Sequence, residues 1–106
     1  MTVHEEDDRG LARRVYASRR PLVVDVWAEW CPPCKALSPV LETLSDEHEE
    51  LEFIKVDADA NDKVLDEYGV RGLPTILLIQ NGEVVARRTG AAPKQVLEGW
   101  LAEELR

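Results

Sequence analysis

The sequence predicts an α/β protein in which a central mixed β-sheet is flanked by helices. Two observations support this class. Strand-like and helix-like segments alternate along the first part of the chain, which favours parallel strands joined by helices, and a later hairpin signal adds antiparallel strands. The 106 residues suit one domain over residues 1–106, because a chain of this length can bury a core without disulfide or metal support.

The first half of the chain predicts two helices and two strands. Residues 5–18 suggest a helix, since acidic residues precede arginines and Leu11 and Val15 share one face. The β-branched run LVVDVW over residues 22–27 predicts a buried strand that carries one charge. A helix is then predicted from the two cysteines to about Glu49, because Leu37, Val40, Leu41 and Leu44 keep helical spacing. Pro39 lies inside this run, so we expect a kink there.

The second half predicts a strand, a short helix, a hairpin and a last helix. EFIKVD at residues 52–57 is strand-like, and Asn61 can cap a short helix that Gly69 closes. Asn-Gly between residues 75–80 and 83–88 is the strongest hairpin signal in the chain. The last helix carries an apolar stripe: Val96, Leu97, Trp100, Leu101 and Leu105.

The charge balance argues against several classes of function. The net charge of −8 disfavours binding to nucleic acid or to an anionic membrane surface. No apolar run approaches the roughly 18 residues that a membrane span requires. The amino-terminal residues are acidic and polar, unlike a signal peptide, so we expect a cytoplasmic protein.

The two cysteines, in the stretch AEWCPPCKAL, carry the clearest chemical signal. Cys31 follows a strand and precedes a helix, so it should lie at a helix N-terminus, where free amides stabilise a thiolate. Cys34 lies one helical turn later, within reach of a disulfide. We therefore expect an exposed first sulfur that attacks a disulfide and an interior second sulfur that resolves the product.

Three other interpretations of the pair are weaker. A metal site needs about four ligands, but no second cysteine pair exists, and His4 and His48 are far apart and are interpreted as surface residues. A permanent structural disulfide across so short a loop would stabilise the fold little, because it removes little conformational entropy from the unfolded chain. A pair kept only for packing remains an alternative. No metal or organic cofactor is expected.

Several motifs together resemble the thioredoxin family. They are VDVWAEWCPPCK, KVDAD, YGVRGLPTILLIQNGEV and TGA, and they extend over nearly all of the chain from Leu22 onward. The resemblance implies a thioredoxin fold and a monomeric protein-disulfide reductase, with Cys31 as nucleophile and Cys34 as resolving thiol. It also implies oxidised protein substrates and a flavin-dependent thioredoxin reductase that draws on NADPH.

The resemblance also assigns two charged residues. Asp25, inside the LVVDVW strand, could by its residue type point to solvent or be buried, and burial would raise its pKa. Its position matches the buried aspartate that exchanges a proton with the resolving cysteine in this family. Lys55 matches the lysine that the family pairs with that carboxylate. Trp27 is interpreted as a packing residue near the site.

A docking surface is implied in the same way. Pro74 matches the family's cis-proline, although an X-Pro bond in general is cis in only about 5% of cases. Its cis bond would orient the Leu73 backbone toward an extended substrate peptide. The substrate-binding set implied around the cysteines is Trp30, Pro32, Pro33, Gly72, Leu73, Pro74, Gly90 and Ala91.

Two features depart from the family. Pro32-Pro33 replaces the usual Gly-Pro; proline suits the first helical turn, but it removes an amide and restricts the loop, so the preferred direction of reaction stays open. A more oxidising oxidase or isomerase and a non-catalytic binding module are the alternatives. The first strand is represented only by residues such as Thr2–His4, so it should be short or absent.

Overall fold

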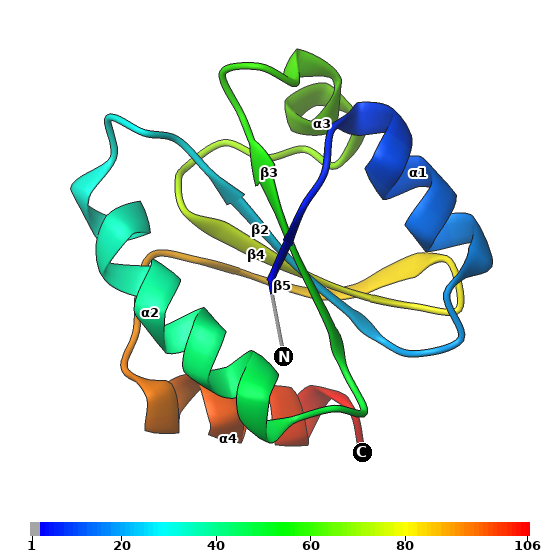
Figure 1. Cartoon of the computed structure of the whole chain (residues 1–106), viewed down its shortest axis with the longest axis vertical. Coiled ribbons are helices and arrows are strands. Elements are labelled where there is room, and N and C mark those ends of the chain that lie inside the picture. Colours follow the sequence, from blue (N-terminus) through cyan, green and yellow to red (C-terminus); the bar gives the residue numbers. More distant parts are fainter. Residues whose placement is uncertain (1–2) are drawn as a thin grey trace.

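The five strands form one mixed sheet, shown in Figure 1, in the order β1-β3-β2-β4-β5. The computed structural model describes residues 3–106, so Thr2, expected in the first strand, lies outside the described residues. The elements are β1 (His4–Glu5), α1 (Asp8–Ala17), β2 (Leu22–Trp27), α2 (Pro32–Glu47), β3 (Glu52–Asp57), α3 (Asp62–Glu67), β4 (Thr75–Gln80), β5 (Glu83–Thr89) and α4 (Lys94–Glu104). This confirms the predicted α/β class with helices flanking a mixed sheet.

Strand β2 lies in the middle of the sheet and brings the later site together. It pairs in parallel with β3 and antiparallel with β4, so Asp25 stands opposite Lys55 on one side and Ile76 on the other. Five of its six residues are buried, as the β-branched run predicts. The carboxyl end of β2 leads through a short loop to Cys31 at the N-terminus of α2.

The helices cover both faces of the sheet (Figure 1). Helices α2 and α4 pack on one face through a cluster that includes Leu37, Leu44 and Leu97. Helices α1 and α3 pack on the other through Leu11 and Val64. Two separate apolar layers result, as expected when each strand alternates its side chains between the faces.

Strand β1 is only two residues long, which confirms the prediction of a short first strand. His4 and Glu5 pair in parallel with Ile54 and Lys55 at the edge of the sheet. The acidic residues that follow start a helix instead of extending the strand. The Asp7 side chain accepts a hydrogen bond from the Gly10 amide, and α1 therefore begins at Asp8, later than the sequence suggests.

Asn61 precedes α3 as predicted, but its side chain does not cap that helix. Its amide oxygen accepts a hydrogen bond from the Asp8 amide at 3.0 Å, and its amide nitrogen donates to the Asp57 carbonyl. Asn61 thus ties the start of α1 to the end of β3. The Asn61 side chain therefore makes long-range hydrogen bonds in place of the local N-cap bond that the sequence predicts.

The predicted hairpin is present, with β4 and β5 paired antiparallel and joined by the Asn81-Gly82 turn. Asn81 and Gly82 both have positive φ angles, 54° and 81°, as a two-residue turn of the primed type requires. Helix α2 ends at Glu47, two residues earlier than expected, and Pro39 lies inside it.

Within the described residues, no helix has the length and apolar character needed to cross a membrane.

Candidate active site

The two cysteines stand at the start of α2 and form a disulfide. Cys31 is the N-cap residue of α2, and its sulfur accepts a hydrogen bond from the Cys34 amide at 3.2 Å. Their Cα atoms are 5.3 Å apart, a usual spacing for a disulfide. Pro32 and Pro33 occupy the first helical positions, where the missing amide hydrogens leave no helical bond unmade.

The expectation of an exposed Cys31 sulfur is wrong for this disulfide form. Cys31 is only 3% exposed and Cys34 only 2%. The reason is local packing: the bonded sulfurs share a small cluster with Ala28, and the side chains of Trp27 and Leu73 pack against them. The Cys31 residue is therefore nearly as buried as its partner while the disulfide is closed.

Exposed side chains surround this buried sulfur pair. Trp30 is 67% exposed, and its indole nitrogen donates a hydrogen bond to Asp59 at 2.9 Å. Pro32 and Pro33 are also exposed. An apolar aromatic ring and two prolines thus border the disulfide, with the ring held in place from the loop after β3.

The loop before β4 completes this border, and its Leu73–Pro74 peptide bond is cis, as predicted. Gly90, at the end of β5, donates its amide to the Pro74 carbonyl at 2.8 Å and has a φ of 99°, which favours glycine. The Thr75 hydroxyl donates to the Gly72 carbonyl at 2.6 Å. Leu73 packs on the cysteines, whereas Ala91 is exposed beyond Gly90.

Asp25 lies behind the cysteines and is buried, with 3% of its surface exposed. It shares a pocket of about 400 Å³ with Cys34 and Lys55. Burial raises the pKa of Asp25 to about 7, although the positive charge of Lys55 acts in the opposite direction. One of its carboxylate oxygens has no hydrogen-bond partner among the described residues, so this carboxyl group can change protonation state near neutral pH.

Lys55 on β3 and Trp27 at the end of β2 line this pocket together. The Lys55 ammonium lies 5.1 Å from the centre of the Trp27 ring, within the range of a cation–π contact. Trp27 is therefore a packing residue beside the site, as the sequence suggests. It packs against the cysteine cluster and also contacts Lys55.

The comparisons with known proteins decide the family. The thioredoxin family model matches residues 2–103. A thioredoxin of Porphyra purpurea is 36% identical over 95% of this chain and 95% of its own length. The Rickettsia typhi thioredoxin is 38% identical over 97% and 99%, and thioredoxin C-2 of Corynebacterium nephridii is 36% identical over 98% and 97%.

The chain belongs to the thioredoxin family. A cysteine pair at disulfide distance fits the thiol–disulfide exchange of this family, and the relatives support a protein-disulfide oxidoreductase. In this exchange two thiols lose two electrons and two protons as their sulfurs join, and a disulfide elsewhere is reduced to two thiols.

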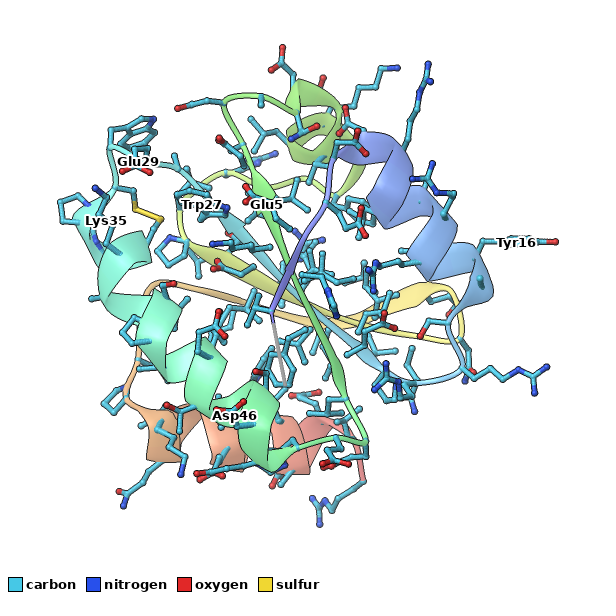
Figure 2. The ribbon with its side chains drawn as sticks, viewed as in Figure 1. Glu5, Tyr16, Trp27, Glu29, Lys35 and Asp46 are labelled. Carbon is cyan, nitrogen blue, oxygen red and sulfur yellow. A yellow bond between two sulfur atoms is a disulfide. The ribbon has the colours of Figure 1, made fainter. Side chains whose placement is uncertain are left out.

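This thioredoxin-type site also contains residues that sequence reasoning missed. Glu29 and Lys35 form an ion pair of 2.9 Å beside the disulfide, and both line the Asp25 pocket; Figure 2 labels them next to the yellow sulfur bond. The third missed residue is Asp59, which accepts the hydrogen bond from the Trp30 indole nitrogen. The i to i+6 spacing of Glu29 and Lys35 has no regular secondary-structure signature, and Asp59 is 29 residues from its partner.

Proposed function

We propose that this chain reduces disulfide bonds in other proteins. The observation that carries the proposal is the position of the Cys31–Cys34 disulfide, at the N-terminus of α2 between an exposed apolar border and a buried carboxyl group. In the reduced form, the Cys31 thiolate attacks one sulfur of a substrate disulfide. The second substrate sulfur leaves as a thiolate and takes up a proton.

Cys34 then completes the reaction. It loses a proton, attacks the Cys31 sulfur of the mixed disulfide and releases, as a thiolate, the substrate sulfur that Cys31 had attacked. Asp25 takes the Cys34 proton, a role supported by its shared pocket with Cys34 and by its pKa of about 7. Lys55 limits the rise of that pKa. The two electrons lost by Cys31 and Cys34 reduce the substrate, and a thioredoxin reductase restores the dithiol.

The border of the disulfide would bind the substrate chain. Trp30, Pro32 and Pro33 supply exposed apolar surface on one side. On the other side, Leu73 and the cis-Pro74 offer backbone for a short extended pairing, flanked by Gly72, Gly90 and Ala91. We further propose that the protein acts in the cytoplasm as a monomeric single domain.

Two cysteine variants test this function. In a protein-disulfide reduction assay, Cys31→Ser should abolish turnover. Cys34→Ser should accumulate a mixed disulfide with the substrate, which intact-mass spectrometry detects as a covalent adduct. A binding module would keep its partner interaction in both variants without turnover, so persistence of function in Cys31→Ser would reject the proposal.

The oxidising direction is the second candidate function. The observation that favours it is Pro32-Pro33 at the first helical positions, which restricts the backbone that must move when the disulfide closes. A cost of closing the disulfide favours the dithiol and makes the pair more oxidising. An oxidase would transfer the Cys31–Cys34 disulfide to reduced substrates. Incubating the oxidised chain with a reduced, unfolded protein and following recovery of its native disulfides separates the two directions.

A further inference from the structure

A second group of chemically active side chains lies at the far end of α2 from the disulfide. Glu47 and His48 end that helix, and α4 runs beneath it (Figure 1) and contributes Glu98. Each of the three residues offers a donor atom, and the three donor atoms all lie within 4.8 Å of one another. Among residues 3–106 this is the group of His, Cys, Asp and Glu side chains that is arranged closely enough to hold a metal ion.

The imidazole of His48 is held between two carboxylates. Its Nε2 lies 3.0 Å from Glu98, inside the group, and its Nδ1 lies 3.1 Å from Glu50, outside it. Metal-binding histidines commonly have this arrangement, in which one ring nitrogen faces the ion and the other donates to an outer carboxylate. Glu50 therefore fixes the ring so that Nε2 faces Glu98.

A cation already occupies the acidic side of the group. The Lys94 ammonium lies 2.7 Å from one Glu47 oxygen and 4.0 Å from one Glu98 oxygen. It brings these two carboxylates, from different helices, toward a shared positive charge. The Lys94 side chain is 37% exposed, so it can turn into solvent if another cation takes its place.

We propose that Glu47, His48 and Glu98 bind a divalent transition-metal ion such as Zn²⁺. One imidazole and two carboxylates form a ligand set that suits zinc, and water would fill the remaining position. The ion replaces the Nε2 proton of His48, which is released, and displaces the Lys94 ammonium. Zinc–ligand bonds of roughly 2.0–2.2 Å require donor atoms about 3.4 Å apart in a tetrahedron, so modest side-chain rotations close the site.

Calorimetric titration of the oxidised chain with Zn²⁺ tests the site, because the closed disulfide removes both cysteine thiolates as ligands. At about pH 8 we expect one ion per chain and an increase in the melting temperature. His48→Gln should weaken binding at least about tenfold. Lys94→Met should strengthen it, because the competing ammonium is gone, and Mg²⁺ should bind far more weakly than Zn²⁺.

His4→Gln is the matched control, since His4 is the other histidine of the chain and lies on the edge strand. It should leave the affinity unchanged. The site is wrong if Zn²⁺ fails to bind at about 1 mM, a level corresponding to only about 4 kcal/mol of binding energy. It is also wrong if His48→Gln binds as tightly as the parent chain, or if loss of affinity follows His4→Gln instead. None of these outcomes depends on the disulfide chemistry.

Discussion

Asp25 on β2 stands directly opposite Lys55 on β3 in the parallel register, and both side chains line the pocket behind Cys34. Burial of the carboxyl group outweighs the attraction of the ammonium, so the pKa of Asp25 is raised from its usual value to about 7. The folded chain therefore retains a proton on Asp25 at pH values where the unfolded chain has lost it. This difference affects stability and, in the mechanism that we propose, catalysis.

The first prediction concerns stability as a function of pH. Because the folded state binds the Asp25 proton more tightly than the unfolded state, this residue makes the chain less stable as pH rises from about 4 to about 7. Asp25→Asn removes the cost of a buried charge. We expect it to increase the free energy of unfolding by about 2–4 kcal/mol at pH 8, and by much less near pH 4.

Urea unfolding of the oxidised protein at both pH values measures this effect. Asp66→Asn, at an exposed position on α3, is the control and should change stability little at either pH. If Asp25→Asn were no more stable than the parent chain at pH 8, burial of the ionised carboxylate would not destabilise the fold. The inference of a raised pKa for Asp25 would then be rejected.

The second prediction concerns the rate of resolution. Without the Asp25 carboxylate, Cys34 loses the buried base of its pocket, because the other carboxylate there, Glu29, is exposed and paired with Lys35. General-base catalysis is typically worth about 10²–10⁴-fold. Asp25→Asn should therefore slow the decay of the mixed disulfide in single-turnover experiments, and the rate should lose its dependence on a group titrating near pH 7. Kinetics identical to the parent chain from about pH 6 to 9 would reject the role of Asp25.

Apart from the two-residue β1, the strands were predictable because each one carries its own local signal. The runs at residues 22–27, 52–57 and 75–80 are strands with these same bounds. Asn81 and Gly82 adopt the turn that their residue types favour. The position of the cysteines at the start of α2 follows from the same local reasoning, since a strand ends and a helix begins around them.

Features that depend on distant residues were not predictable from pattern. The Asn61 side chain bonds to Asp8, 53 residues away, and not to its own helix. The cluster that buries Cys31 includes Leu73, a residue of the loop before β4 that lies far away in the sequence. Glu98 reaches His48 across 50 residues, so the two appear unrelated in the sequence. In each case tertiary contacts override the local preference.

The third prediction concerns the apolar border. Trp30→Ala removes an exposed ring next to the disulfide and should lower kcat/KM for a folded protein substrate by about tenfold, as expected for loss of a central aromatic anchor. Reduction of a small disulfide, which contacts little of this surface, should change far less. Tyr16→Ala removes an even more exposed aromatic ring, 94% exposed on α1, and is the matched control. Equal losses in both variants would argue against docking at Trp30.

The fourth prediction concerns the two prolines. Pro32→Gly restores an amide hydrogen at the first position of α2 and frees the loop that must move when the disulfide forms. We expect the reduction potential to shift by about 30 mV or more, which corresponds to about 1.4 kcal/mol for two electrons. Pro39→Ala, inside the same helix but away from the cysteines, is the control. Identical potentials for the parent chain and Pro32→Gly would show that Pro32 does not tune the site.

The reduction potential of the Cys31–Cys34 pair tests the central claim most directly. It is measured by equilibrating the chain with dithiol buffers and following the fluorescence of Trp27 and Trp30, which border the disulfide. A protein-disulfide reductase should give a value near −270 mV, which is the general reference for thioredoxin and not a quantity derived from this structure. A value of about −180 mV or higher, in the range of isomerases and oxidases, would contradict the proposed direction of reaction.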